Sequence, residues 1–288
     1  MRASSIDDNI FKRRMPFFET DQVKFHYEEY GSGPNIMLAF HGFGMRGTQF
    51  RHLEPSLGAR YKIYSFDLFF HGHTSLKNNA LDVIRKGMTP TEFAAQLKPF
   101  IDQVSKSAKI SLLSYSIGSC LALALLQELP EMVEEVFFIA PDGIKPNKLL
   151  RIGASFKPAN NFLWKLVNSP KVVNFSLRLL NKLNYIDDSL CSILDREFGT
   201  TESRMVSYNT ITFNSKMVFD KEKLAQLINA NNIKCYLYFG RKDVLFPPSI
   251  GKEFSALLEN SVLHIEDDGH DLVNPRLNNV IANHLAVY

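Results

Sequence analysis

A serine stands where a buried strand turns directly into a helix. Residues 110–115 form a short apolar run typical of a buried strand, and residues 117–129 are too long and too rich in Ala and Leu for one. Ser116 lies between them, with room for no more than a sharp turn. Such a corner exposes the hydroxyl above the sheet, with the free N–H groups of the helix start behind it. The position suits a nucleophile, and it equally suits a serine that only caps the helix.

The sequence around this serine resembles the nucleophile elbow of the α/β-hydrolase family. The usual pattern is G-x-S-x-G, and this chain has Ser114-Tyr115-Ser116-Ile117-Gly118, with serine in place of the first glycine. The resemblance covers nearly the whole chain, from about Val23 to the end. It implies an α/β-hydrolase fold, in which helices flank a mostly parallel central sheet and Ser116 is the nucleophile.

Two later loops match the partners that a catalytic serine needs. A serine hydroxyl is a weak nucleophile unless a base takes its proton and an acid orients that base. In this family the serine, the acid and the histidine follow in that order, each after a strand. Residues 240–247, GRKDVLFP, resemble the acid loop and supply Asp243, while residues 268–271, DGHD, resemble the histidine loop and supply His270. The resemblance therefore implies a triad of Ser116, His270 and Asp243.

Each partner has a simpler explanation when it is taken alone. A loop aspartate usually stabilises a turn, and a loop histidine is usually a surface residue. The chain order and the three predicted strand ends together favour the triad. Asp142 is the rival acid, because it also ends a predicted strand and some hydrolases take their acid from that strand. The turn formed by Pro141-Asp142-Gly143 explains it more simply, so we prefer Asp243.

The same resemblance implies an oxyanion hole. A tetrahedral intermediate carries negative charge on the former carbonyl oxygen, so two N–H donors must already point at it. One is the backbone N–H of Ile117, at the start of the elbow helix. The other comes from residues 41–44, HGFG, which match the family's H-G-x-x loop. By that match Phe43 is the donor and Gly44 the alternative, while His41 bonds the backbone of its own loop.

A third loop offers residues for the substrate pocket. Residues 67–74, DLFFHGHT, resemble the family's D-x-x-G-x-G-x-S loop, with Phe70 in place of a glycine and Thr74 in place of a serine. Phe69 and Phe70 are candidates for the pocket wall. His71 and His73 raise the question of a metal site, but no third ligand stands near them, so we assign them to loop structure. We expect neither a metal nor a cofactor.

The order of the predicted elements agrees with this fold. Strands alternate with helices, which predicts a largely parallel sheet covered on both faces. The rhythm stops over residues 144–220, where three or four helices are expected. The resemblance interprets this segment as a helical cap inserted after the strand that follows the elbow helix, with residues 1–143 and 221–288 as the core. Buried strands are expected at residues 36–40, 61–66, 110–115, 133–140, 233–239 and 262–265.

The first part of the predicted cap is basic and apolar. Residues 144–186 contain no acidic side chain. We favour solvated basic faces on helices whose apolar sides pack against the core. The alternatives are a cap that attracts anionic or acyl-chain substrates, or one that rests on an acidic membrane surface. Trp164 is a further candidate for the substrate pocket. The basic residues are Lys145, Lys148, Arg151, Lys157, Lys165, Lys171, Arg178 and Lys182.

Composition sets outer limits. The chain has 288 residues, of which 45% are hydrophobic and 22% charged, as in an ordinary globular protein. A net charge of +3 is too small to argue for a nucleic-acid partner. Three cysteines cannot all pair and have no metal-ligand spacing, which suits a reducing compartment. We find neither a signal peptide nor a run of transmembrane length, so a cytoplasmic location is expected.

Ester hydrolysis is the leading functional hypothesis. Serine at the elbow argues against the dehalogenases and epoxide hydrolases that share the fold, because they carry aspartate there. Carbon–carbon bond hydrolases of ring-cleavage products remain an alternative, although they usually have Trp soon after the histidine and His270 is followed by Asp271-Leu272. A non-catalytic ligand-binding protein is the other alternative. We expect a carboxylesterase, lipase-like or thioesterase-like, acting on a small acyl substrate, and leave the oligomeric state open.

Overall fold

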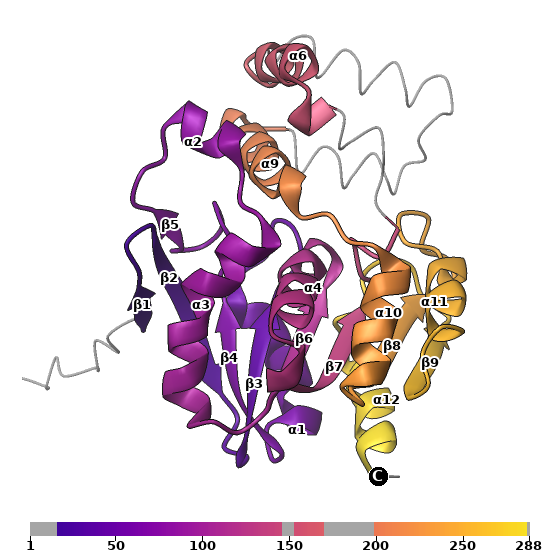
Figure 1. Ribbon diagram of the computed structural model, residues 1–288. Helices are drawn as coiled ribbons and strands as arrows, with labels where there is room; N and C mark the ends of the chain where they lie inside the picture. The colour runs from indigo at the N-terminus through magenta and orange to yellow at the C-terminus, as the bar shows by residue number, and fades with distance from the viewer. Residues whose placement is uncertain (1–15, 146–152, 170–198, 287–288) are drawn as a thin grey trace, which may run out of the picture.

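A computed structural model describes residues 16–145, 153–169 and 199–286 (Figure 1). Their strands form one nine-stranded sheet in the order β1-β2-β4-β3-β6-β7-β8-β9, with β5 paired to β2. Strands β3, β4 and β6 to β9 are parallel, and β2 runs antiparallel to β4. The strands are β1 (Phe17–Glu19), β2 (Val23–Tyr30), β3 (Asn35–Phe40), β4 (Tyr61–Phe66), β5 (Ser75–Leu76), β6 (Ile110–Tyr115), β7 (Val133–Ile139), β8 (Lys234–Gly240) and β9 (Ser261–Glu266).

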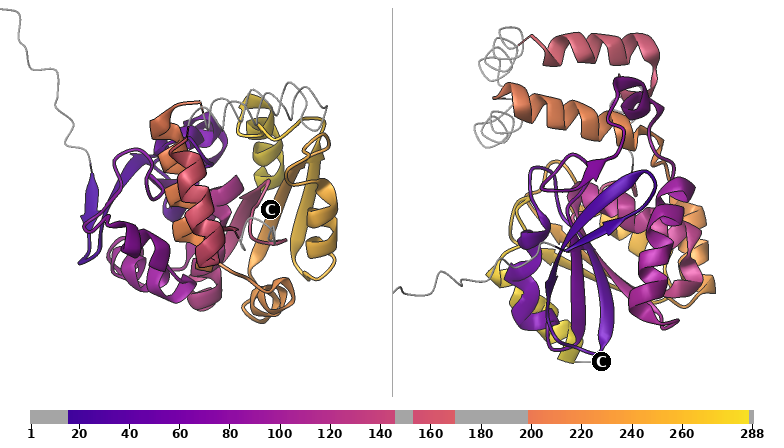
Figure 2. Two further views of the ribbon diagram at one scale, coloured as in Figure 1. Left: turned by 90° about the horizontal axis from the view of Figure 1, so that it is seen from above. Right: turned by 90° about the vertical axis from the view of Figure 1, so that its left-hand side faces the viewer.

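Helices cover both faces of the sheet (Figures 1 and 2). One core lies under α3, α4, α10 and α11, and a second lies under η1, α1 and α12. The described helices are α1 (Glu54–Leu57), α2 (Leu81–Lys86), α3 (Pro90–Ser105), α4 (Ser119–Glu128), α6 (Lys157–Val167), α9 (Thr201–Phe213), α10 (Lys221–Ala230), α11 (Pro248–Ser255) and α12 (Pro275–Ala286), with 3-10 turns η1 (Gly47–Leu53), η2 (Ser116–Gly118), η3 (Pro130–Met132) and η4 (Asn214–Lys216).

Strand β6 is buried on both faces of the sheet. Successive side chains of a strand point to opposite faces of the sheet. Leu112 accordingly belongs to the core under α3 and α4, while its neighbour Leu113 belongs to the core under α12. Because both faces are covered, most of its side chains are apolar, and the buried hydroxyls of Ser111 and Ser114 bond to Glu135 and Ser119. The predicted fold class, a mostly parallel sheet flanked by helices, is confirmed.

Parallel pairing brings the candidate loops to one edge. Phe40 pairs with Ser114 across β3 and β6, and Gly240 pairs with Glu266 across β8 and β9. The loops that follow these strands therefore begin at the same end of the sheet. That edge is where side chains from distant parts of an α/β chain meet.

One helix start differs from the prediction. The expected elbow helix at residues 117–129 begins with the 3-10 turn Ser116–Gly118 and becomes α-helical only at Ser119. The segment after β3 is the 3-10 helix Gly47–Leu53 followed by one α-helical turn, α1. Helix α3 begins at Pro90, where Thr89 and Glu92 form a capping box.

Helices α6 and α9 stack above the carboxyl ends of the parallel strands, with α9 between α6 and the sheet (Figures 1 and 2). Asn160 on α6 bonds to Thr212 and accepts from the Tyr208 hydroxyl, both on α9. The guanidinium of Arg204 is fully buried and donates to the Val167 carbonyl at 2.9 Å, which ties the two helices together. The predicted cap boundaries stay a prediction, because residues 146–152 and 170–198 lie outside the described residues.

Candidate active site

Ser116 occupies the sharp corner between β6 and α4. Its backbone φ is +51°, in the left-handed region that non-glycine residues rarely adopt. The corner approaches β3 so closely that a Cβ at Gly118 would lie 2.2 Å from the Phe40 carbonyl oxygen, and only glycine fits there. Ser114, in place of the first glycine of the elbow pattern, is buried with its Oγ 3.0 Å from Ser119 Oγ. A hydrogen bond therefore accommodates the extra hydroxyl.

The structure brings the three predicted triad residues together. The Oγ of Ser116 lies 3.1 Å from Nε2 of His270, and Nδ1 of His270 lies 2.7 Å from Oδ2 of Asp243. The imidazole is about one-fifth exposed, while the carboxylate is fully buried. Because a carboxylate only accepts hydrogen bonds, the proton on Nδ1 faces Asp243 and Nε2 is left to accept from the serine hydroxyl. This is the arrangement in which a histidine acts as a general base.

The loop after β8 fixes the carboxylate by its backbone. The N–H groups of Leu245 and Phe246 donate to Oδ1 of Asp243 at 2.9 Å and 3.0 Å. These bonds occupy one oxygen and leave the other for His270. The turn explanation and the catalytic explanation of Asp243 therefore hold together, since one oxygen closes the turn and the other orients the imidazole.

Two aromatic rings flank His270, and neither was expected from the sequence. The ring of Tyr115 stacks on the imidazole with centroids 5.2 Å apart, and its hydroxyl donates to the His270 carbonyl at 2.9 Å. The ring of Phe246 lies 5.5 Å from the same imidazole. Tyr115 directly precedes the serine. A Cβ at Gly42 would lie 2.4 Å from the Tyr115 ring, so the glycine at position 42 is the sequence feature that reflects the packing of this ring.

Asp142, the rival acid, has a different set of partners. Its Oδ1 accepts from the Gly143 N–H at 2.7 Å, and its own N–H donates to the Ser116 carbonyl at 3.1 Å. Loss of hydration raises the pKa of this carboxyl, while the nearby His270 acts to lower it. Asp142 thus stabilises the turn behind the serine, and Asp243 is the carboxylate that bonds the imidazole.

The loop after β3 holds its N–H groups in fixed positions. The Gly42 N–H donates to the Gln49 side chain at 3.0 Å, and the Gly44 N–H donates to Nε2 of His71 at 3.1 Å. Gly44, the alternative oxyanion donor, is therefore already engaged. Among the described contacts, none uses the N–H of Phe43, which lies between these two.

His41 bonds the backbone of its own loop, as the sequence analysis expected. Its Nδ1 lies 2.7 Å from the Gly42 carbonyl oxygen, and its Nε2 accepts from the Leu68 N–H at 3.0 Å. Because burial removes its hydration, and because the neighbouring His71 acts in the same direction, the pKa of His41 is lowered to about 3. Neutral His41 therefore joins the loop after β3 to the loop after β4.

Asp67 is the anionic centre of this region. It accepts from the backbone N–H groups of Gly47 at 2.7 Å and His73 at 2.8 Å, and its Oδ2 lies 2.7 Å from Nδ1 of His26. Burial alone would raise the pKa of Asp67, but these backbone bonds and the neighbouring histidines reverse the shift, so its pKa is lowered. The carboxylate stays charged and keeps the two loops in register.

Comparison with known proteins decides the family. The profile of the alpha/beta hydrolase fold matches residues 35–273. The chain belongs to the α/β-hydrolase family.

Relatives of this hydrolase point the same way. It is 22% identical to the uncharacterized hydrolase YugF of Bacillus subtilis over 93% of this chain and 95% of that protein. It is 25% identical to the pimeloyl-[acyl-carrier protein] methyl ester esterase of Vibrio campbellii, over 43% of this chain and 47% of that enzyme. An esterase from Thermogutta terrifontis superposes with a TM-score of 0.66 at 13% identity, over 92% of this chain and 94% of that one. The chain is thus an α/β-fold hydrolase with esterases among its relatives.

The predicted pocket residues of the hydrolase have different surroundings. Phe69 is only 2% exposed and packs against Phe25, Phe93 and Phe213, and its place in the pocket wall stays a prediction. Phe70 is half-buried, with a left-handed φ of +65°, and stays a candidate. A glycine at this position would adopt that φ without strain, which is why the family pattern has one there.

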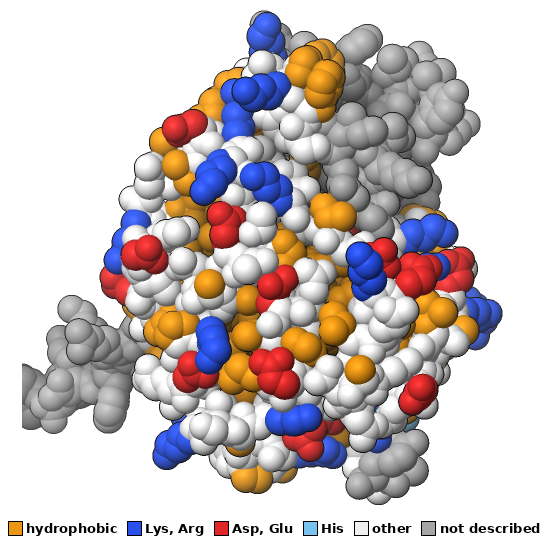
Figure 3. Space-filling view, in the orientation of Figure 1, with side chains coloured by type: hydrophobic (Ala, Val, Ile, Leu, Met, Phe, Trp, Pro, Cys, Tyr) orange, Lys and Arg blue, Asp and Glu red, His pale blue; other side chains and the backbone are white. Residues whose placement is uncertain are grey.

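Trp164 stays a candidate as well, but its ring packs between α6 and α9, 4.9 Å from that of Tyr208. The outer side of α6 is both basic and apolar. Phe156 and Phe162 are 59% and 65% exposed, and Lys157 and Lys165 are exposed beside them. Figure 3 shows blue and orange side chains at the top of the molecule, where Figure 1 has α6. Attraction of anionic substrates and contact with a membrane surface both stay predictions.

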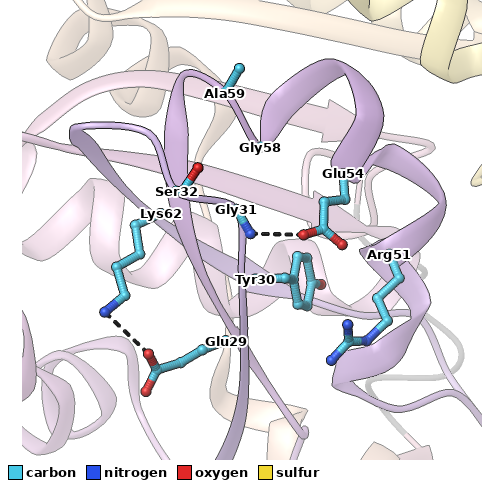
Figure 4. A pocket seen from close by; sticks show the side chains of 9 residues that line it. All are labelled: Glu29, Tyr30, Gly31, Ser32, Arg51, Glu54, Gly58, Ala59 and Lys62. Atoms are coloured by element: carbon cyan, nitrogen blue, oxygen red, sulfur yellow. Dashed lines mark hydrogen bonds and ion pairs between the residues drawn. The ribbon is translucent and has the colours of Figure 1, made fainter.

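A surface cavity of about 580 Å³ lies at the opposite end of the sheet from the triad (Figure 4). Its charged side chains are engaged with one another or with backbone. Lys62 pairs with Glu29 at 3.1 Å, and Glu54 accepts from the Gly31 N–H at 2.9 Å. Arg51 pairs with Glu28 and lies over the Tyr30 ring, so we assign this cavity no ligand.

Within residues 16–145, 153–169 and 199–286, no three His, Cys, Asp or Glu side chains come together as a metal site. The His71 ring bonds to Gly44 and Phe69. None of the described helices combines the length and apolar character needed to cross a bilayer.

Proposed function

We propose that this hydrolase cleaves carboxylic esters through an acyl-enzyme formed on Ser116. The observation that carries the proposal is the continuous line of hydrogen-bonding distances from Ser116 Oγ to His270 Nε2 (3.1 Å) and from His270 Nδ1 to Asp243 Oδ2 (2.7 Å). The esterases among the relatives support the same substrate class.

In the first half of the reaction, His270 takes the proton of Ser116 as the serine oxygen attacks the ester carbonyl. The N–H groups of Phe43 and Ile117 stabilise the negative charge on the former carbonyl oxygen. His270 then gives its proton to the leaving alcohol, and the acyl group stays on the serine. Asp243 stabilises the imidazolium that forms between these steps.

In the second half, His270 deprotonates a water molecule that attacks the acyl-enzyme. The same two N–H groups stabilise the second tetrahedral intermediate, and the proton returns to Ser116 as the carboxylic acid leaves. The substrate is a small acyl ester, and the length of its acyl chain is set by cap side chains.

A panel of p-nitrophenyl esters of increasing chain length tests this proposal. We expect turnover of at least one ester by the wild-type protein and none above background by S116A. A ring-cleavage dienoate belongs in the same panel. If the protein cleaves the dienoate and no ester, the carbon–carbon bond hydrolase replaces the esterase as the assignment.

A further inference from the structure

His71 lies beside the loop that carries the proposed oxyanion donor, and its hydrogen bonds define its protonation. Its Nδ1 lies 2.9 Å from the Phe69 carbonyl oxygen, which only accepts, so the ring proton is on Nδ1. Its Nε2 lies 3.1 Å from the Gly44 N–H, which only donates, so Nε2 carries no proton. His71 is therefore neutral, and both of its ring nitrogens are used.

The same ring also packs against the residue between the two fixed glycines. The rings of His71 and Phe43 meet edge to face with centroids 5.2 Å apart. On the far side of Phe43, the Gly42 N–H is held by Gln49. The peptide N–H groups before and after Phe43 thus have partners, and the side chain of Phe43 rests on the imidazole. The N–H of Phe43, which no contact among the described residues uses, therefore has its direction set from both sides.

We propose that His71 is a positioning residue of the oxyanion hole: it anchors the Gly44 amide and the Phe43 ring so that the Phe43 N–H points at the developing oxyanion. The inference rests on the proposed function, since an oxyanion hole has a purpose only in acyl transfer. The charged and titratable groups that face His71 are His41, whose ring lies 5.4 Å away, and Asp67. Burial lowers the pKa of His71, which keeps Nε2 an acceptor.

A pair of amide substitutions separates positioning from simple packing. In H71Q the side-chain oxygen reaches the place of Nε2 and can accept from the Gly44 N–H. In H71N the shorter amide matches Nδ1, so it keeps the bond to Phe69 and leaves Gly44 without a partner. H73N is the matched control, because the side chain of His73 is exposed on the same loop.

We expect kcat of H71N to fall roughly 10- to 100-fold below that of H71Q, with KM within about threefold, because a misdirected donor weakens transition-state binding and not substrate binding. The affinity for a trifluoromethyl ketone, which forms an oxyanion on Ser116, should fall in parallel. H73N should match the wild type. Equal kcat values for folded H71N and H71Q would overturn the proposal.

A measurement on the wild-type protein keeps the test independent of how the variants fold. Nitrogen NMR of ¹⁵N-histidine-labelled protein reports the tautomer of each imidazole. We expect His71 with its proton on Nδ1, and a proton on Nε2 at neutral pH would overturn the proposal. If the wild type turns over no substrate at all, the proposed function fails, whereas active H71N with wild-type kcat removes only the role of His71.

Discussion

Asp243 and Asp142 follow neighbouring strands, and their hydrogen-bond partners show that they have different roles. One oxygen of Asp243 accepts from two backbone N–H groups while the other faces Nδ1 of His270. Asp142 instead closes a turn and supports the backbone of Ser116. The two carboxylates differ in which oxygen atoms accept hydrogen bonds and from which groups. Replacing each aspartate by asparagine, which changes one oxygen to an NH₂ group, tests this difference.

D243N should lower kcat by roughly 10³- to 10⁴-fold. The asparagine oxygen keeps the bonds to Leu245 and Phe246, so its NH₂ group faces Nδ1 of His270. That donor forces the imidazole into the tautomer with the proton on Nε2, which cannot accept from Ser116. D142N is the matched control and should stay within about threefold of the wild type. A D142N defect as large as that of D243N would contradict the assignment of the acid.

The backbone of Ser116 gives a second prediction at this scale. A φ of +51° costs an L-residue about 1 kcal/mol relative to glycine. Both S116A and S116G remove the hydroxyl, so both should be inactive. S116G should be the more stable by about 1 kcal/mol in urea unfolding, because glycine adopts this φ freely. Equal stability of the two variants would mean that the elbow is not strained.

At the scale of elements, buried polar groups join the loops after β3 and β4. His41 and His71 each span the two loops, since each has one bond in either loop. Both have lowered pKa values because they are buried. A buried histidine that stays neutral in the folded protein but binds a proton when unfolded makes stability depend on pH.

The sign follows from the direction of the shift. Well above pH 6.5 His41 is neutral in both states, so it adds no pH dependence. Below pH 6.5 the unfolded state binds the proton, and the slope of the free energy of unfolding approaches about 1.4 kcal/mol per pH unit until His41 itself protonates near pH 3. Between pH 6.5 and 5.5, urea unfolding should show a loss of about 1 kcal/mol from His41, to which His71 adds. H71Q removes one such group and should reduce the slope, whereas stability that is constant over this interval would contradict the neutral histidines.

Much of the order of helices and strands could be predicted from the sequence, and the features that could not be predicted depend on contacts between distant residues. The Ile- and Leu-rich run 110–115 identifies its strand from local sequence alone. The 3-10 start of the elbow helix could not be predicted, because it follows from the left-handed φ of Ser116, which the close approach to β3 imposes. The contacts of Tyr115 and His71 could not be predicted for a similar reason, because their partners lie in loops that are distant in sequence. The burial of Phe69 was equally hidden, because it depends on α9, where Phe213 packs against its ring.

At the scale of the whole molecule, helix α6 and the residue before it place positive charge and exposed aromatic rings on the surface of the predicted cap. Lys157 and Lys165 stand on α6 beside Phe156 and Phe162, and the described part of α6 has no acidic residue. A field of one sign near an entrance raises the local concentration of ligands of the opposite sign. If this basic surface acts on substrates, we predict that it favours anionic acyl esters over neutral ones.

The double variant K157Q/K165Q should lower kcat/KM for an anionic ester roughly twofold to tenfold at low salt, and leave a neutral ester of the same length unchanged. The effect should vanish as salt is added, because screening removes it. K24Q/K62Q makes the same change in net charge on strands β2 and β4, away from the cap, and serves as the control. Equal losses for both esters would remove the electrostatic role of the cap.

The central claim is that Ser116 is an activated nucleophile, and covalent labelling tests it most directly. Treatment with a fluorophosphonate followed by peptide mass spectrometry should find one adduct on the wild-type protein, at Ser116, because His270 removes the hydroxyl proton during attack. The adduct should be absent from S116A and strongly slowed in D243N. A folded wild-type protein that takes up no probe, or takes it up at another residue, would contradict the account.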